Sequence, residues 1–544
     1  MKRLLAAAVA VFALTASILA FVNASGAPWR FDWPDETSTA YFARRIAAGE
    51  SVTAEDPDIA LLERRLHPRS VNVRDGMLVP AGFVGLPILL GTVGRVFGNT
   101  ASLFVVPLLA AASGFGLYVA LRSVLSQRHA VLSAVLFLFH PATWYFAAFT
   151  HLPNIPFLAL LILSAAGMAL ARSQKKHAVP LFALSGAAAG LAFGIRLSEA
   201  LWAVPVLLVL LAATSFGSPV SRRVAGGVRW RQAAAWFLGL SLAIAPTLLL
   251  QQVLFGSLLA GYARFSEAGI ALPSESVGGV LAYIFPFGIH PLRAAARFWD
   301  SFLAPFWWYA IPAVVGVILA GYAAWGDASR QRRMFARGAL VIAGLVCGYL
   351  VLLYGSWQFA DPLMLAVNTV GRSYVRYWLP IALAMSIAAA GALERLEGFP
   401  ELRVRIVGRV LLAGMIVASF SLVFVTANES LQQTYYRTRE YRRMAAAVEA
   451  IVPPDGIILT QRLDKAFFPE RRVIALEGPL WEDQQAIDLV ARYGTAYHFY
   501  YIDDLHDDGR IAARSVFVKF GVDATVRTYL RGESIPVYEL TVRK

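Results

Sequence analysis

The chain has 544 residues, of which 58% are hydrophobic and 15% are charged, and its mean hydropathy is +0.58. This composition excludes a disordered chain and a collagen, and the single cysteine, Cys347, excludes a disulfide-stapled scaffold. The formal net charge of +14 does not indicate nucleic-acid binding, because the basic excess is spread between apolar segments of residues 1–427.

Apolar runs of about twenty residues, the length that crosses a bilayer, recur along the chain. The first extends from Leu4 to Val22 and is longer than a usual signal-peptide core, so we expect an uncleaved span, with a signal peptide as the alternative. The other predicted spans are 100–121, 130–149, 153–171, 178–195, 197–213, 233–255, 302–325, 339–354, 377–393 and 410–426. The sequence therefore predicts an α-helical membrane protein with about eleven transmembrane helices.

A further apolar run at 79–97 contains two prolines and four glycines. If this run does not span, 17 Lys and Arg residues fall in loops on one side of the membrane and six in the outer connections from 150 to 377. The positive-inside rule favours that arrangement. We therefore expect an interfacial or re-entrant helix at 79–97, within a long outer loop at 25–98. The N-terminus is then cytoplasmic and the C-terminus extracytoplasmic.

The long outer loop carries the most informative helix signal. Pro34 near a helix start, two acids in the first turn and Gly49 at the end predict a helix of about four turns. Asp35 and Glu36 then lie at the positive end of this helix, close to the lipid headgroups. Capping of the helix is the alternative explanation of the two acids. Three apolar side chains of the helix are expected to lie on the membrane: Tyr41, Phe42 and Ile46.

Residues 428–544 are soluble in character and predict a small extracytoplasmic α/β domain beside the membrane domain 1–427. The expected helices are 435–451 and 482–493, and the expected strands are 456–461, 472–476, 495–502 and 535–542. The segment contains no phosphate loop, metal-ligand spacing or nucleophile elbow, so we interpret it as an accessory domain.

Several short segments of this chain occur in the same order, and at the same places in the predicted topology, as in a known superfamily. They are Asp35-Glu36 followed by Tyr41, the run from Leu78 to Gly98, Phe139-His140-Pro141, Gly190 to Gly194, and Arg376-Tyr377-Trp378-Leu379-Pro380. On these segments the chain resembles the polyprenyl-phosphate-sugar glycosyltransferases of the GT-C fold, in the branch of protein O-mannosyltransferases and lipid A aminoarabinose transferases. The resemblance covers about 1–215 and 370–395.

The resemblance implies transfer of a sugar from a polyprenyl-phosphate donor to a glycan, lipid or protein acceptor. It implies direct displacement with inversion, with Asp35 as the catalytic acidic residue. The chain departs from the branch at two places: 76–80 lacks the Lys-Pro-Pro or Pro-Pro-Leu pattern, and the second outer loop at 150–154 carries no acid. The richness in Ala and Arg indicates a prokaryote, and hence an inner membrane whose lipids surround the spans and whose outer face is periplasmic.

The chemistry of such a transfer needs a base and cations. An acceptor hydroxyl or amine loses a proton as it attacks the anomeric carbon, which calls for a carboxylate near the headgroup plane. Asp35 fits this role by position, and Glu36 or Asp32 are the alternatives. Arginine is the preferred phosphate ligand, since its guanidinium can grip two oxygens and stays charged near lipid.

Arg372 and Arg376 lie one helical turn apart, and either bind the donor phosphate or anchor a span among interfacial aromatic residues. Arg196 interrupts an apolar stretch, where a charge is functional or paired, and Glu199 is its candidate partner. The remaining candidates for phosphate binding are His151, His290 and Arg293.

No group of residues has the spacing of a zinc site, and Asp35 with Glu36 would hold any divalent cation. The rival functions are another lipid-linked glycan ligase or polymerase, a multispan transporter, and a membrane scaffold. A transporter predicts internal repeats and ionisable groups at the middle of the membrane. The acids of this chain cluster in the outer loops instead, which favours the glycosyltransferase.

Overall fold

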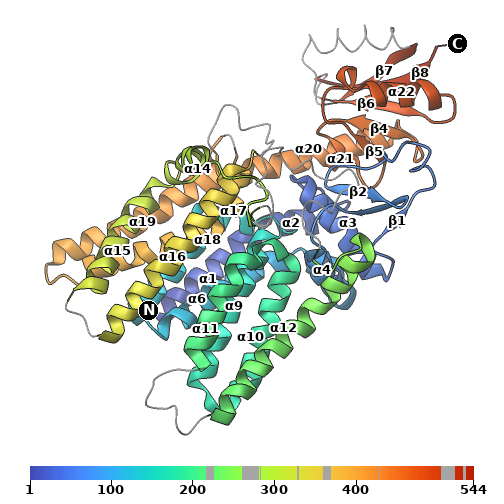
Figure 1. Cartoon of the computed structure of the whole chain (residues 1–544). Coiled ribbons are helices and arrows are strands. Elements are labelled where there is room, and N and C mark those ends of the chain that lie inside the picture. Colours follow the sequence, from blue (N-terminus) through green and yellow to red (C-terminus); the bar gives the residue numbers. More distant parts are fainter. Residues whose placement is uncertain are drawn as a thin grey trace.

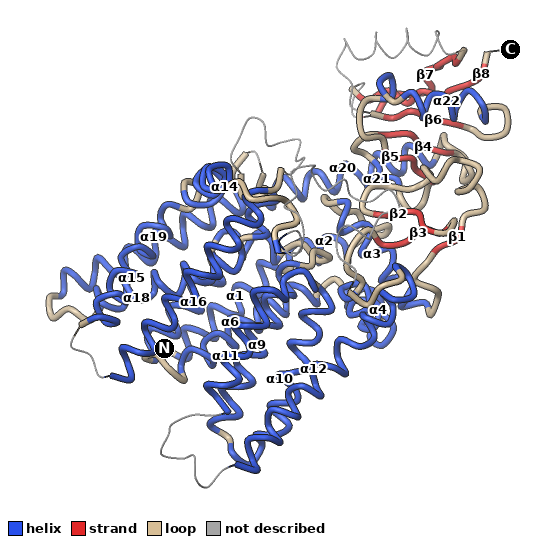
Figure 2. The backbone as a smooth tube through the Cα atoms, in the orientation of Figure 1, coloured by secondary structure: helices blue, strands red, loops and turns tan. Residues whose placement is uncertain are grey.

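The computed structural model describes residues 1–215, 226–259, 281, 284–326, 330–358, 369–427, 429–503, 521–530 and 534–543. It consists of a bundle of long helices, and its strands gather in a smaller region at one end of that bundle (Figures 1 and 2). Both the long first loop, residues 25–98, and the C-terminal residues contribute to this smaller region.

The helices of the bundle follow the predicted spans. They are α1 (Lys2–Ala16) with α2 (Ile18–Ala24), α6 (Val105–Arg122), α7 (Gln127–Leu138) with α8 (Pro141–Ala147), α9 (Asn154–Ser173), α10 (Ala178–Ile195), α11 (Ala200–Ser215), α12 (Gly226–Phe255), α15 (Trp307–Trp325), α16 (Arg330–Ser356), α18 (Leu379–Glu397) and α19 (Leu402–Phe420). Within the described residues, 8 helices are long and apolar enough to cross a membrane, or up to 10 if each bent pair is one span. The shorter apolar helix Leu197–Ala212 occupies the remaining predicted span. The prediction of a multispan helical membrane protein is confirmed.

The bent pair α7 and α8 has a clear local cause. Pro141 cannot donate a backbone hydrogen bond to the preceding turn, and it disfavours helical geometry at the residue before it. His140 is accordingly extended, with φ −61° and ψ 131°, and its Nδ1 accepts a hydrogen bond from the Ala142 N–H at 3.2 Å. The two helices meet at 56°, so the Phe139-His140-Pro141 segment turns the chain where α8 begins.

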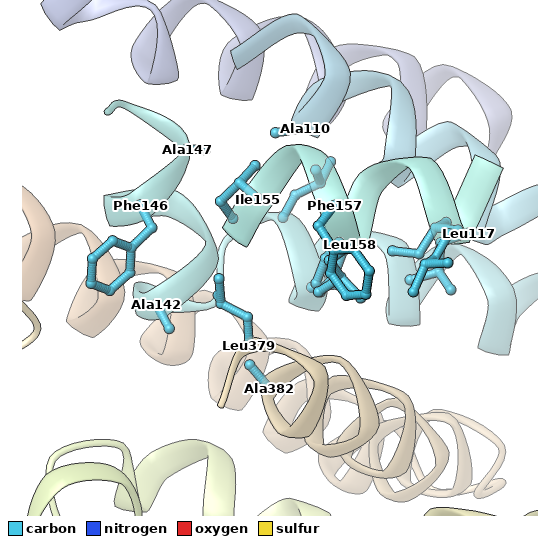
Figure 3. Packing of buried hydrophobic residues seen from close by; sticks show 14 of the residues in the cluster. Ala110, Leu117, Ala142, Phe146, Ala147, Ile155, Phe157, Leu158, Leu379 and Ala382 are labelled. Carbon is cyan, nitrogen blue, oxygen red and sulfur yellow. The ribbon is translucent and has the colours of Figure 1, made fainter. Parts of the chain in front are cut away.

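Small residues allow the helices of the bundle to pack closely. A Cβ atom on Gly186 of α10 would lie 1.9 Å from the Trp236 carbonyl oxygen of α12, and one on Gly239 would lie 2.0 Å from the Ala183 carbonyl oxygen. Elsewhere aromatic and aliphatic side chains interlock, as Figure 3 shows for Phe157 and Leu158 among neighbouring helices. Close packing of this kind is a main source of helix association in lipid.

The long first loop folds into two helices and a small sheet. Helix α3 (Pro34–Ala48) ends at Gly49, whose φ is 81°, so the predicted helix is confirmed. Strands β1 (Ala54–Glu55), β2 (Val71–Arg74) and β3 (Met77–Pro80) pair antiparallel in the order β1-β3-β2. Helix α4 (Gly85–Phe97) follows. The helix predicted at 79–97 therefore begins only at Gly85, because its first residues belong to a strand.

Helix α4 rests on both α3 and the bundle. A Cβ atom on Gly85 would lie 2.2 Å from the Gly194 carbonyl carbon at the end of α10, and one on Gly91 would lie 2.7 Å from the Ile46 Cβ of α3. The expectation that the apolar side of α3 lies on the membrane is wrong. Ile46 packs against α4, Phe42 is fully buried, and Tyr41 contacts Phe468 with ring centroids 4.8 Å apart.

The C-terminal residues form the predicted α/β arrangement. Their helices are α20 (Leu431–Glu449), α21 (Asp464–Phe467) and α22 (Gln484–Tyr493), and their strands are β4 (Ile457–Thr460), β5 (Arg472–Ala475), β6 (Phe499–Ile502), β7 (Val522–Leu530) and β8 (Ile535–Val542). The sheet order is β5-β4-β6-β8-β7, with β4 parallel to β5 and β6 and with β8 antiparallel to β6 and β7. Strand β7 was not expected, because it is an edge strand rich in polar residues.

The long first loop and the C-terminal residues share one hydrophobic core, which we call the head. It unites Phe42, Ile59 and Val71 of the loop with Phe467 of α21 and Ile474 of β5. Ion pairs between Arg65 and Asp483 and between Arg472 and Asp58 cross the same junction. The division of the chain into two domains at residue 427 remains a prediction. The head is where the membrane bundle meets the C-terminal residues.

Candidate active site

The two acids at the start of α3 lie in different surroundings. Pro34 occupies the first position of the helix, and Trp33 before it is extended, with φ −106° and ψ 137°. Successive helical residues point in different directions. The Asp35 side chain is accordingly 38% exposed, whereas Glu36 is only 2% exposed. One carboxylate is open to a ligand and the other belongs to the interior.

Asp35 is held by two donors, one on each oxygen. Arg376 Nη1 donates to Oδ2 at 2.9 Å, and Ser70 Oγ donates to Oδ1 at 2.6 Å. Burial alone would raise the pKa of Asp35, but the Arg376 charge and the Ser70 hydroxyl outweigh it and hold the pKa below its ordinary value. Asp35 is therefore an ionised carboxylate of fixed orientation at neutral pH.

Arg376 connects this carboxylate to the membrane bundle. It lies on the short helix α17 (Ser373–Tyr377), directly before α18, and its side chain is only 10% exposed. Its guanidinium carbon lies 4.8 Å from the Trp33 ring centroid and 5.2 Å from the Tyr377 ring centroid. Two aromatic rings and one carboxylate thus fix the position of a charged guanidinium that is largely withdrawn from water.

A second arginine shares the same aromatic ring and the same cavity. The guanidinium carbon of Arg196 lies 4.8 Å from the Tyr377 ring centroid, and its Nη2 donates to Glu199 Oε1 at 2.7 Å. Tyr354 also hydrogen-bonds to Glu199. The residues that line the cavity are Asn154, Phe157, Leu158, Arg196, Glu199, Arg376, Tyr377, Leu379 and Pro380. Two guanidinium groups therefore border one cavity beside Asp35.

Glu36 faces the second predicted outer loop instead of this cavity. Its Oε1 accepts a hydrogen bond from the His151 backbone N–H at 3.3 Å. Burial raises the pKa of Glu36 to about 8, so the folded protein holds it mainly protonated at neutral pH. A neutral, enclosed carboxyl suits a structural tie between α3 and residues 150–151 better than proton abstraction.

His151 is also enclosed. Its Nδ1 lies 2.7 Å from Thr150 Oγ1, and its ring centroid lies 4.9 Å from that of Phe31. Burial lowers the pKa of His151 to about 3, so the imidazole is neutral at physiological pH. The structure thus places His151 beside Glu36 as an uncharged group among aromatic rings.

The other predicted phosphate ligands, Arg372, His290 and Arg293, make hydrogen bonds to two serine residues. Arg372 Nη1 donates to Ser301 Oγ at 3.0 Å. The His290 backbone N–H donates to Ser356 Oγ at 3.0 Å, and Arg293 Nη1 donates to the Ser356 carbonyl at 3.3 Å. These contacts place His290 and Arg293 at the C-terminal end of α16.

Sequence reasoning did not identify Ser70, which comes from a turn whose approach to Asp35 has no local signature. Asp32, the alternative base, accepts hydrogen bonds from Arg437 Nε at 3.0 Å and Nη2 at 2.6 Å, and Lys465 lies beside it. Burial raises the pKa of Asp32, but Lys465 and Arg437 bring it below the ordinary value. Asp32 thus ties α3 to the C-terminal residues.

Asp35 and Glu36 do not fit a divalent-cation site. One carboxylate is paired with Arg376 and the other is enclosed and protonated. Among the residues that the structure describes, no group of three or more His, Cys, Asp or Glu side chains could hold a metal ion.

Comparisons with known proteins match this architecture. Residues 86–225 match the family model described as dolichyl-phosphate-mannose-protein mannosyltransferase. The fold is similar to that of ArnT from Cupriavidus metallidurans, with a TM-score of 0.54 and 14% sequence identity, covering 98% of this chain and 97% of that chain. It is also similar to the oligosaccharyltransferase AglB from Archaeoglobus fulgidus, with a TM-score of 0.50 and 13% identity, covering 92% of this chain and 69% of that chain.

None of the curated proteins compared matches the chain significantly. At 14% and 13% identity the structural likeness establishes the fold alone. The family match adds a similarity to a sugar-transferase family over residues 86–225. The chain is thus a multispan membrane protein of the GT-C fold, and the family match over residues 86–225 supports a glycosyltransferase.

Proposed function

We propose that the protein transfers a sugar from a polyprenyl-phosphate donor to a glycan, lipid or protein acceptor at the extracytoplasmic face of the cell membrane. The observation that carries the proposal is the Asp35–Arg376 pair beside a cavity bordered by a second arginine, Arg196. A carboxylate base next to two phosphate ligands is the arrangement that displacement of a lipid phosphate requires.

In the proposed reaction, the acceptor oxygen or nitrogen attacks the anomeric carbon while Asp35 takes its proton. The bond between the anomeric carbon and the phosphate oxygen breaks, and the lipid phosphate leaves with the electron pair. Arg376 and Arg196 stabilise the charge of the departing phosphate. A single displacement from the opposite side inverts the anomeric configuration.

The pairing of Arg376 with Asp35 gives donor binding a second effect. A donor phosphate that engages Arg376 draws its charge away from Asp35, and the pKa of Asp35 then rises because the guanidinium is what holds it low. The base becomes stronger when the donor is in place. Binding of the donor thus prepares the carboxylate for proton abstraction.

The proposal is tested with purified protein and a panel of labelled polyprenyl-phosphate sugars, with and without a chelator. Wild-type protein releases or transfers label from at least one donor, and Asp35→Asn does not. Glu36→Gln retains activity as the matched control on the neighbouring position. Release only from a diphosphate-linked donor would indicate a different lipid-linked glycan enzyme, and folded protein inactive on every donor would contradict the proposal.

A further inference from the structure

We propose that Ser70, held by the Arg69–Asp464 ion pair, is a positioning residue that fixes the Asp35 carboxylate for the reaction. The inference rests on the proposed function, since it takes Asp35 to be the base. It gives the C-terminal residues a role in the chemistry, because Asp464 lies on α21 of the head.

The contact with Asp35 is direct. Ser70 Oγ donates to Oδ1 at 2.6 Å while Arg376 holds Oδ2 at 2.9 Å. Two donors on different oxygens fix the rotation of a carboxylate. One donor alone would leave this rotation less restricted. When a donor phosphate engages Arg376, Ser70 remains as the group that orients Asp35.

The backbone of Ser70 is strained in a way that needs outside support. Its φ is 60°, in the left-handed region that non-glycine residues rarely adopt. Such a conformation persists only where surrounding contacts determine it, and it occurs preferentially at functional sites. The Ser70 carbonyl accepts a hydrogen bond from the Ala81 N–H at 3.3 Å, which fixes one side of the turn.

Asp464 fixes the other side of the turn. Its Oδ2 accepts the Arg69 backbone N–H at 2.8 Å, and its Oδ1 accepts Arg69 Nε at 2.9 Å. Asp464 is 1% exposed, so these bonds are shielded from water. The residue directly before Ser70 is therefore clamped through both its backbone and its side chain. The Arg69 charge also contributes to lowering the pKa of Asp35.

Another ion pair across the same junction offers a matched comparison. Arg65 Nη1 donates to Asp483 Oδ1 at 2.8 Å, and Asp483 caps α22 by accepting the Ala486 N–H at 3.1 Å. This pair joins the long first loop to the C-terminal residues as Arg69–Asp464 does. It differs in having no direct connection to the turn that carries Ser70.

The test measures kcat, the donor KM and the pH dependence of transfer for Ser70→Ala, Ser70→Gly, Asp464→Asn and Asp483→Asn, together with the melting temperature of each. Loss of a hydrogen bond to a charged group predicts a kcat lower by about tenfold or more in Ser70→Ala and Ser70→Gly, with the donor KM little changed. The acid limb of the pH profile moves to higher pH, because a group that lowers the Asp35 pKa is gone. Ser70→Gly melts higher than Ser70→Ala, since glycine adopts a positive φ without strain.

Asp464→Asn is expected to shift the acid limb in the same direction and to lower the melting temperature. Asp483→Asn lowers the melting temperature without moving the acid limb, which separates positioning from general stability. A wild-type kcat and pH profile in Ser70→Ala, or equal shifts in Asp464→Asn and Asp483→Asn, would overturn the inference.

Measuring Asp35→Asn in parallel distinguishes a failure of the inference about Ser70 from a failure of the assignment of Asp35 as the base. If Asp35→Asn is inactive while Ser70→Ala behaves as wild type, only the inference about Ser70 is lost. If Asp35→Asn is as active as wild type, the base assignment and the inference are both wrong.

Discussion

Adjacent residues on α3 illustrate how strongly local surroundings decide the state of an acid. Asp35 and Glu36 differ by one position, yet the pKa of Asp35 is lowered and that of Glu36 is raised to about 8. The sequence favours Asp35 by position and leaves Glu36 as an alternative base. Only the arginine on α17 and the loop that covers Glu36 distinguish the candidate base from the enclosed carboxyl.

The raised pKa of Glu36 predicts a pH-dependent stability. Between its ordinary value of 4.5 and about 8, the folded protein keeps a proton that the unfolded chain has released, so stability falls as pH rises through this window. Glu36→Gln removes this titration. The melting temperature of Glu36→Gln, relative to wild type, should therefore rise from pH 5 to pH 8.

Asp35→Asn provides the control for that measurement. The pKa of Asp35 is lowered, so its contribution to stability is lost only as pH falls toward and below the ordinary value of 3.8. The difference between Asp35→Asn and wild type should be flat from pH 5 to pH 8. A flat Glu36→Gln difference over the same range would show that Glu36 is ionised in the folded protein.

Arg376 is predicted to act through its shape as well as its charge. Arg376→Lys keeps a positive charge but loses the planar fork and the contacts with Trp33 and Tyr377. We expect kcat/KM for the donor to fall by about 10- to 100-fold, the range for a charged hydrogen bond. Arg45→Lys, at the far end of α3, is the control and should leave kcat/KM near wild type. Equal values for Arg376→Lys and wild type would remove Arg376 as a phosphate ligand.

At the scale of helices and strands, residues that act on their own backbone were sufficient to predict where a helix begins and ends. Pairings and contacts between distant segments could not be predicted from the sequence. Pro34 and Gly49 delimit α3 because each acts on its own backbone. Strands β2 and β3 were missed, since their pairing and the positive φ of Ser70 leave no local pattern. The membrane-facing surface expected for α3 was wrong for a related reason, because Tyr41 contacts Phe468 from the other end of the chain and Ile46 packs against α4.

Close helix packing gives a prediction for α10 and α12. A Cβ atom on Gly186 would lie 1.9 Å from the Trp236 carbonyl oxygen, so the helices must move apart to accept a side chain. Overpacking of this kind costs about 1–3 kcal/mol. Gly186→Ala should lower the melting temperature of the detergent-solubilised protein. Gly344→Ala on α16, where nothing lies within 4 Å, is the control, and equal melting temperatures would contradict the packing argument.

At the scale of the whole molecule, the candidate base belongs to a shared structure. Asp35 comes from the long first loop, Arg376 from α17, and the supporting Asp464 from the C-terminal residues. Residues separated by 341 positions meet in the Asp35–Arg376 hydrogen bond. The sequence indicated that an acid and an arginine were needed at the site. Apart from the family resemblance in the order of the motifs, it did not indicate that Asp35 and Arg376 form a hydrogen bond.

The predicted topology places the head outside the cytoplasm. It can be checked by labelling with an impermeant thiol reagent in a Cys347→Ala background, comparing Ser173→Cys at the end of α9 with Arg443→Cys on α20. Both positions are exposed. Arg443→Cys should react in intact cells and Ser173→Cys only after permeabilisation. Reaction of both in intact cells would contradict the proposed orientation.

The most direct test of the account is single-turnover transfer from the identified donor, with the anomeric configuration of the product determined by NMR. We expect wild-type protein to give the inverted product, and Asp35→Asn to react about 10²- to 10⁴-fold more slowly, the usual contribution of a positioned base. A product of retained configuration would contradict the single displacement. Transfer by Asp35→Asn at the wild-type rate would show that the base lies elsewhere.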